Sequence, residues 1–268
     1  MKLNIYQKIC GAFFLILVVF WAWIAIQGLK EGFYNYFYSF LFGLIPLVAG
    51  AVAMIKSNVW GGFGSKVGKA VFFIGLGIFF WGTGEMIWSY YNFFMNVPAP
   101  YPSLADLGFA PSIFFYGLGA FYLSGATGAK FSLRNKNAKV IVVLASALIL
   151  LISYYLLVLV GRGGVLIPDG ETPLKIILDV AYPLGDFIAL LLGVIISGLS
   201  FKYLGGKYKY DIYAILLGLG VMFIADAIFS YTTTAGTYYN ANFGDLMLST
   251  GTFLLSFGVL GFCKSKSD

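Results

Sequence analysis

Long apolar stretches separated by short polar connectors make up almost the whole chain. Eight stretches reach about 20 residues or more, the length that an α-helix needs to cross a bilayer. Their apolar residues run continuously and do not alternate with polar ones, which excludes transmembrane β-strands. The expected spans are residues 8–29, 33–55, 67–94, 105–128, 138–161, 173–199, 210–232 and 243–263. We predict an all-α, polytopic bundle of eight transmembrane helices, with residues 1–268 forming one integral membrane domain.

The composition agrees with this pattern. Hydrophobic residues make up 60% of the chain and charged residues only 10%, whereas soluble domains carry about 25% charged residues. Connectors this short leave no room for a soluble catalytic or nucleic-acid-binding domain, so membrane lipid is the expected surrounding and no nucleic-acid partner is expected. The chain has no histidine, which removes haem ligation by histidine and HExxH zinc chemistry. No cofactor is expected.

The distribution of positive charge predicts the topology. Under eight spans, three basic residues fall on one side of the membrane: Lys30, Arg162 and Lys175. The remaining fourteen fall on the other side: Lys2, Lys8, Lys56, Lys66, Lys69, Lys130, Arg134, Lys136, Lys139, Lys202, Lys207, Lys209, Lys264 and Lys266. By the positive-inside rule, both termini of this multi-pass protein lie in the cytoplasm, and the cell membrane is the expected location. The two cysteines, Cys10 and Cys263, are then unpaired packing residues near a reducing compartment.

The two halves of the chain repeat each other weakly. When "GTGEMIWSY" is laid on "FIADAIFSY", Glu85 falls on Asp226 and Ser89 on Ser230. An Asp-Leu pair follows at nearly constant spacing, beginning at Asp106 in the first copy and at Asp245 in the second. We therefore predict two parallel four-span repeats, about 1–135 and 136–268, with a binding site at the seam between them.

Six of the eleven acidic residues lie in or at the mouths of apolar segments. A carboxylate at the centre of a membrane helix costs roughly 2.5–3.5 kcal/mol even on lenient scales. The six are Glu85, Asp106, Asp179, Asp186, Asp226 and Asp245. The predicted topology places them all between the midplane and the outer surface of the membrane.

These acids do not all point to the same role. Asp106 and Asp245 open their helices, where a carboxylate caps free N–H groups, and capping is preferred over a metal site for both. Asp179 could pair with Lys175 one turn away. The other three, Glu85, Asp186 and Asp226, have no lysine or arginine deep in a span to neutralise them. They form either a functional site or a structural hydrogen-bond network. The expected ligand-binding residues are Glu85, Asp186, Asp226, Asp179, Ser89, Ser230, Tyr182 and Trp88.

Glycine clusters in the expected spans favour close helix packing through small residues. They include Gly75, Gly77, Gly82, Gly84, Gly117, Gly119, Gly218 and Gly220. Tyrosines near span ends, among them Tyr238, are expected to belong to the aromatic belt of the membrane interface.

Three segments carry a resemblance to a known class of proteins: "PYPSLAD" (100–106), "AYPLGD" (181–186) and "FIADAIFSY…FGDL". With them, the chain resembles the polytopic membrane modules that stand N-terminal to bacterial and archaeal diguanylate cyclase, phosphodiesterase and histidine kinase domains. The resemblance implies an integral membrane sensory or ligand-binding module. Because this chain ends at Asp268 without such a domain, a separate cytoplasmic signalling partner is expected.

Two functions remain open from the sequence. One is a sensory or ligand-binding module whose acidic, aromatic-lined cavity, in the outer half of the membrane, takes a small cation, an amine or a lipid headgroup. The alternative is a proton- or cation-coupled secondary transporter that uses the same carboxylates. Enzymatic activity is not expected. An intramembrane aspartyl protease is a third, disfavoured hypothesis, since Gly185-Asp186 and Gly244-Asp245 lack the first glycine of the Gly-x-Gly-Asp element of that class.

Overall fold

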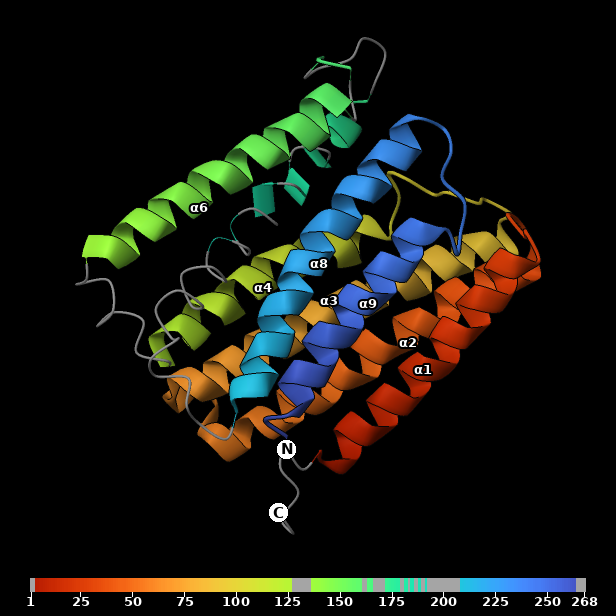
Figure 1. The fold of residues 1–268 in the computed structure, drawn as a ribbon. Coiled ribbons are helices and arrows are strands. Elements are labelled where there is room, and N and C mark those ends of the chain that lie inside the picture. Colours follow the sequence, from red (N-terminus) through yellow and green to blue (C-terminus); the bar gives the residue numbers. More distant parts are fainter. Residues whose placement is uncertain are drawn as a thin grey trace.

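The described part of the chain is helical and contains no strand (Figure 1). The computed structural model describes residues 3–126, 136–160, 163–165, 172–178, 181–182, 184–185, 188, 191 and 208–263. Its long helices are α1 (Ile5–Ile26), α2 (Phe33–Lys56), α3 (Lys66–Phe94), α4 (Asp106–Ala126), α6 (Lys136–Tyr154), α8 (Lys209–Thr234) and α9 (Phe243–Leu260). Two short 3₁₀ turns (Ser57–Trp60 and Gly62–Gly64) connect α2 to α3, and a π-helical segment (Tyr155–Val160) continues α6.

The predicted all-α class is confirmed, and within the described residues six helices are long and apolar enough to cross a membrane. They are Ile5–Ile26, Phe33–Trp60, Lys66–Phe94, Asp106–Ala126, Lys209–Thr234 and Phe243–Leu260. Each coincides with an expected span to within a few residues, because a continuous apolar run fixes a transmembrane helix more firmly than local propensity does. Residues 138–160 of the expected span 138–161 are helical as well. The expected span 173–199 lies largely outside the described residues, so the eight-span count and the two repeats stay predictions.

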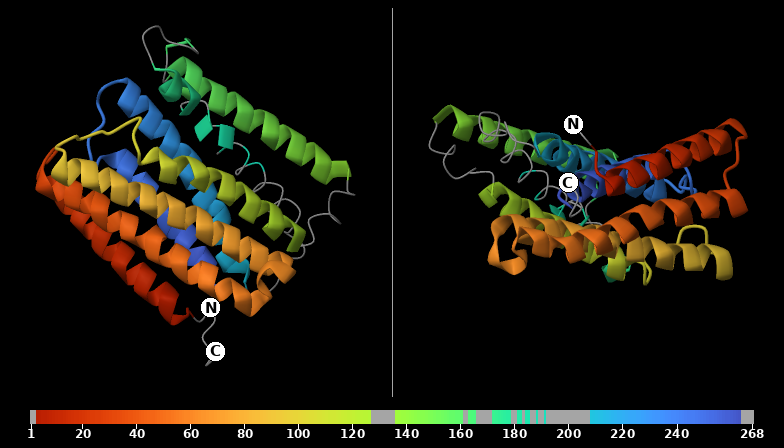
Figure 2. Two further views of the ribbon diagram at one scale, coloured as in Figure 1. Left: turned by 180° about the vertical axis from the view of Figure 1, so that it is seen from behind. Right: turned by 90° about the horizontal axis from the view of Figure 1, so that it is seen from below.

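The helices form a bundle centred on α3 and α9. Helix α3 packs between α2 and α4, α9 packs against α8 and α2, and α1 lies along the edge formed by α2 and α9. Figures 1 and 2 show α6 on the opposite side of the molecule from α1, beyond α4 and α8. The centre of the bundle therefore lies among α2, α3, α4, α8 and α9.

Several chain segments that carry lysine meet at one end of the bundle. Asn4 caps α1 and donates from Nδ2 to the carbonyl of Leu260 at the end of α9 (2.7 Å). Trp60 donates from Nε1 to the carbonyl of Phe262 (2.7 Å). These contacts bring together the start of α1, the α2–α3 connector and the end of α9. We call this the lysine-rich end, and its lysines are Lys8, Lys56, Lys66, Lys69 and Lys209.

The opposite end is held together by Asn240, which is 1% exposed. Its Oδ1 accepts from Trp88 Nε1 (2.9 Å) and from the Ser39 hydroxyl (3.2 Å). Its Nδ2 donates to the carbonyl of Pro98 (2.7 Å), and its own carbonyl accepts from Asn35 Nδ2 (2.8 Å). One side chain thus joins α2, α3 and two connectors, and we call this the Asn240 end.

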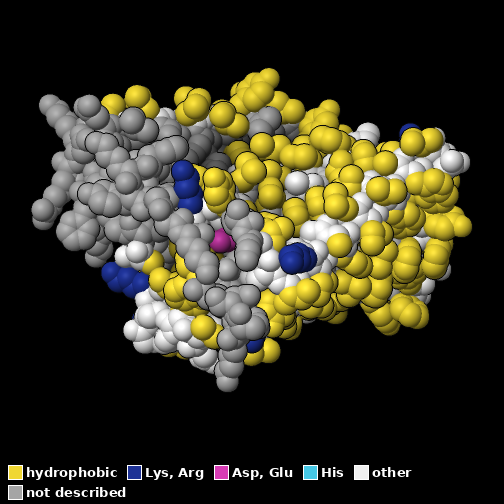
Figure 3. Space-filling view, turned by 60° about the horizontal axis from the view of Figure 1, so that its bottom comes forward, with side chains coloured by type: hydrophobic (Ala, Val, Ile, Leu, Met, Phe, Trp, Pro, Cys, Tyr) yellow, Lys and Arg dark blue, Asp and Glu magenta, His cyan; other side chains and the backbone are white. Residues whose placement is uncertain are grey.

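The outer surface is apolar. Val19 and Ile26 of α1 are 70% and 81% exposed, and Figure 3 shows hydrophobic side chains over most of the face in view, with few lysines or arginines. Polar side chains such as Asn35, Asn92 and Ser112 are buried instead. This arrangement suits a lipid environment, in which apolar side chains face outward and polar groups find partners inside.

Glycine allows α3 to approach its neighbours closely, as the sequence predicts. A Cβ on Gly108 of α4 would lie 2.5 Å from the Cα of Gly84, and a Cβ on Gly82 would lie 2.5 Å from the backbone nitrogen of Leu47 in α2. At Gly117 an added Cβ would meet no described residue within 4 Å, so the described part of the chain shows no close contact there.

Candidate functional site

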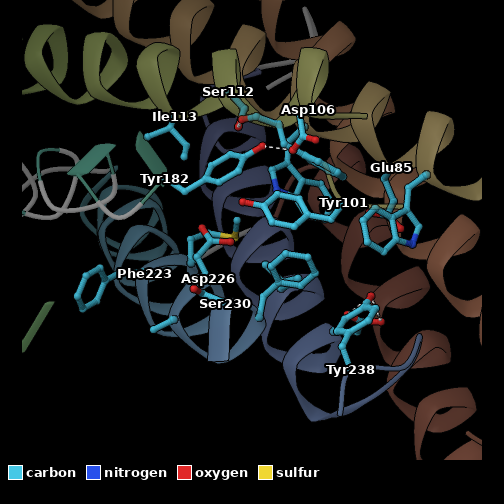
Figure 4. A pocket seen from close by; sticks show the side chains of 18 of the residues that line it. Glu85, Tyr101, Asp106, Ser112, Ile113, Tyr182, Phe223, Asp226, Ser230 and Tyr238 are labelled. Carbon is cyan, nitrogen blue, oxygen red and sulfur yellow. Dashed lines mark hydrogen bonds between the residues drawn. The ribbon is translucent and has the colours of Figure 1, made fainter. Parts of the chain in front are cut away.

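A cavity lies between α2, α3, α4, α8 and α9, toward the Asn240 end (Figure 4). Its volume is about 70 Å³, and a single water needs about 10–15 Å³ on the same measure, so several water-sized groups fit. Four carboxylates line it: Glu85, Asp106, Asp226 and Asp245. Aromatic side chains supply most of the remaining wall: Phe42, Trp81, Trp88, Tyr101, Phe109, Tyr182, Phe223, Phe229 and Tyr238. None of the described lining residues is a lysine or an arginine.

Glu85 is the carboxylate with the least support from the protein. It is 5% exposed, and its side chain accepts no hydrogen bond from any residue within the described ranges. On α3 it lies between Trp81 and Trp88, four residues before it and three after, so all three share one side of the helix. Gly43 of α2 makes room for it, because a Cβ there would lie 2.6 Å from Glu85 Cγ. The sequence predicts this shared face correctly.

Asp245 is held by hydrogen bonds at the start of α9. Its Oδ2 accepts the backbone N–H of Ala241 (2.6 Å), and the Tyr238 hydroxyl donates to Oδ1 (3.2 Å). The side chain of Asn242 caps the same turn by accepting from the Asp245 N–H (3.0 Å). Burial, followed by the negative charges of Asp245 and Glu85, raises the pKa of the Tyr238 hydroxyl well above its usual range. Tyr238 therefore keeps its proton and acts as a donor.

Asp106 repeats this arrangement at the start of α4. Its Oδ2 accepts the backbone N–H of Ser103 (2.7 Å), and the Tyr182 hydroxyl donates to Oδ1. Both aspartates thus accept a backbone N–H from the connector just before their helix, and both also contribute to the cavity wall. A structural hydrogen bond and a place at the site are not alternatives for these two residues.

The remaining expected site residues divide into three groups. Asp226, Ser230, Tyr182 and Trp88 line the cavity; Figure 4 shows Asp226 and Tyr182 on the side opposite Glu85 and Tyr238. Ser89 is buried on α3, but it does not line the cavity, and its hydroxyl has no hydrogen-bond partner among the described residues. Two further expected residues, Asp179 and Asp186, lie outside the described residues.

The aromatic rings at the Asn240 end meet edge to face. The centroids of Trp88 and Tyr238 are 5.9 Å apart at 84°, and those of Tyr238 and Phe229 are 5.1 Å apart at 76°. Tyr101 meets Phe229 at 5.7 Å and 84°. This geometry is favourable for aromatic pairs, and it leaves ring faces that are not stacked on one another. The cavity wall therefore combines aromatic rings with carboxylates.

Sequence reasoning missed several residues that matter here. Tyr238 is not part of an aromatic belt, because its hydroxyl points to a buried carboxylate. Tyr101 lies in the "PYPSLAD" segment but was not expected in the site. Asp211, in the first turn of α8, is another buried carboxylate, and it accepts from Gln7 Nε2 (2.8 Å). It lies at the lysine-rich end and is not part of the cavity.

The described residues show neither a metal-ligand cluster nor a cysteine in the cavity. No group of three or more aspartate, glutamate or cysteine side chains within the described ranges lies close enough to hold a metal ion. Both cysteines are buried and are not among the cavity residues.

Comparison with known proteins gives no relative from which a function could be transferred. No family model, curated protein or solved structure matches the chain. The candidate function therefore depends on the geometry of the cavity.

Proposed function

We propose that this chain is an integral membrane ligand-binding module whose cavity takes a small cationic ligand. The observation that carries the proposal is the buried Glu85 carboxylate, which accepts no hydrogen bond from the described residues and faces a cavity without lysine or arginine among its described lining residues. A buried carboxylate is costly unless it is protonated, hydrogen-bonded or paired with a cation. A ligand cation supplies the missing partner.

In this proposal the protein spans the cell membrane eight times, with both termini in the cytoplasm. The Asn240 end then faces outward, and the cavity lies in the outer half of the membrane. The lysine-rich end lies at the cytoplasmic surface, as the positive-inside rule requires. There it would meet a signalling partner if the chain acts as a sensor, the role that its resemblance to membrane sensor modules implies.

A second candidate function is a proton- or cation-coupled transporter. One observation favours it: Glu85 and Asp226, which the weak repeat places in equivalent positions, both line the same cavity. In parallel-repeat transporters the site lies at the interface of the repeats. Uptake of a ligand into proteoliposomes would support the transporter, whereas binding without uptake supports the sensory module.

Ligand binding at the cavity can be tested by filling it. We expect that a phenylalanine at Ser230, which lines the cavity from α8, removes the space for a ligand. In a thermal-shift screen of detergent-solubilised protein against amines, inorganic cations, lipids and neutral compounds, a hit should stabilise the wild type but not Ser230→Phe. The matched control is Thr234→Phe, one turn further along α8 at an exposed position outside the cavity, which should respond like the wild type. A screen without any hit, or equal responses of Ser230→Phe and the wild type, would contradict the proposal.

The topology can be tested with two engineered cysteines. Thr237 is exposed in the α8–α9 connector, and Gly64 is exposed in the α2–α3 connector with nothing within 4 Å of an added Cβ. We expect a membrane-impermeant maleimide to label Thr237→Cys on intact cells, and Gly64→Cys only after permeabilisation. The native Cys10 and Cys263 are buried and should stay unlabelled. Labelling of both engineered sites on intact cells would exclude the proposed topology.

A further inference from the structure

We infer that the ligand is a small organic ammonium ion, held by Glu85 as its counter-ion and by the faces of the surrounding aromatic rings. This inference rests on the proposed function and names the class of its ligand. It distinguishes an organic ammonium from the other cations that an acidic cavity could attract.

An inorganic cation does not find enough ligands here. Calcium takes six to eight oxygens at about 2.3–2.6 Å, and magnesium needs near-octahedral coordination at about 2.0–2.1 Å. Asp106 and Asp245 already accept hydrogen bonds from backbone N–H groups and tyrosine hydroxyls. No three acidic side chains in the described part of the chain converge as a metal site requires. Among the described lining residues, Glu85 is the carboxylate that accepts no hydrogen bond, and it supplies one ligand of the several needed.

An organic ammonium needs a different environment, and the cavity provides it. Such an ion binds to the face of a tryptophan, tyrosine or phenylalanine within about 6 Å of the ring centroid. Trp81 and Trp88 flank Glu85 on α3, and Phe109, Phe229 and Tyr238 continue the wall. Alkyl groups on the ammonium would bury apolar surface against these rings, which a hydrated metal ion cannot do.

The polar groups of the wall agree with a cationic ligand. Asp106, Asp226 and Asp245 add negative charge on the other sides of the cavity, which disfavours an anion. A neutral ligand of similar shape would not pair with the Glu85 carboxylate, so it would gain no charge interaction from this site. The cavity also limits the size, since a volume of about 70 Å³ corresponds to about five water-sized groups. Tetramethylammonium, with one nitrogen and four methyl groups, is therefore a suitable probe.

Isothermal titration calorimetry of the detergent-solubilised full chain tests the inference, at mildly alkaline pH so that carboxyl ionisation is favoured. The probes are tetramethylammonium chloride, sodium chloride and tert-butanol, a neutral molecule of the same size and branching. We expect saturable binding of tetramethylammonium that is at least about tenfold tighter than binding of tert-butanol or sodium, about 1.4 kcal/mol.

Two matched variants separate the counter-ion from general charge. Glu85→Gln keeps the shape of the side chain and removes its charge, and we expect it to weaken tetramethylammonium binding about tenfold or more. Glu31→Gln makes the same change at an exposed position outside the cavity and should bind like the wild type. A thermal melt of each variant in detergent verifies that the fold is intact.

The outcomes distinguish this inference from the proposed function. Equal affinities for tetramethylammonium and tert-butanol, tighter binding of sodium, or unchanged binding in Glu85→Gln would overturn the ammonium assignment. If the cavity-filling test with Ser230→Phe still identifies another ligand, the proposed function stands without it. Failure of both the calorimetric test and the Ser230→Phe test would contradict the existence of a ligand-binding site in this cavity.

Discussion

Replacement of Asn240 by alanine is expected to destabilise the protein by about 3 kcal/mol or more, because it leaves several buried polar groups without partners. Trp88 Nε1, the Ser39 hydroxyl and the Pro98 carbonyl would each lose a hydrogen bond at a position closed to solvent. Each buried unsatisfied group costs about 1–3 kcal/mol. The variant should also loosen the Asn240 end of the cavity, since Trp88 forms part of its wall.

Thermal unfolding in detergent measures this effect. For a chain of this size we expect the midpoint to fall by about 2–4 °C for each kcal/mol lost. The control is Thr237→Ala in the same connector, where the side chain is exposed and its hydrogen bond to Thr232 is long (3.4 Å). Equal midpoints for Asn240→Ala and Thr237→Ala would show that the hydrogen-bond cluster around Asn240 does not stabilise the bundle.

A pair of glycine substitutions on α4 should have opposite effects on stability. In Gly108→Ala the new methyl group would meet the backbone of Gly84 at 2.5 Å, and two backbones cannot yield as a flexible side chain can. Helices α3 and α4 must then separate, at a cost of about 1–3 kcal/mol or more. In Gly117→Ala the new methyl group meets no described residue within 4 Å, so the higher helix propensity of alanine should stabilise the helix by up to about 1 kcal/mol.

The same thermal melts report both variants, and ligand binding gives a second readout. Gly108 lies between Asp106 and Phe109, which both line the cavity, so separation of α3 and α4 should also weaken binding of the tetramethylammonium probe. Gly117→Ala should leave binding unchanged. If Gly108→Ala is as stable as Gly117→Ala, the close contact of α3 and α4 is not as the structure describes it.

The helices themselves were predictable, and the reason is physical. A run of about 20 apolar residues has few alternatives to a transmembrane helix, so expected spans such as 33–55 and 67–94 match α2 and α3 closely. The predicted face of α3 is correct for the same kind of reason, because helical periodicity alone places Glu85 and Trp88 together. These inferences need only the geometry of a single helix.

The parts of the site that could not be predicted depend on contacts between helices. Helical periodicity places Ser89 on the same side of α3 as Glu85, but it does not show which neighbouring helix packs over each residue. Ser89 is buried away from the cavity. Tyr101, Tyr238 and Asn240 lie in connectors, whose course is decided by tertiary hydrogen bonds and not by hydropathy. The sequence does not distinguish Asp211 from other residues at span ends, because the hydrogen bond that it accepts from Gln7 joins α8 to α1.

The most direct measurement of the central claim is to locate a bound cation in the protein. Tetramethylarsonium is the arsenic analogue of tetramethylammonium, and its anomalous diffraction in crystals of the full chain would mark the position of the ion. The account predicts an arsenic peak inside the cavity, beside Glu85 and within about 6 Å of an aromatic ring centroid, that is lost in crystals of Glu85→Gln. A peak elsewhere on the protein, no peak in the cavity, or an unchanged peak in Glu85→Gln would contradict it.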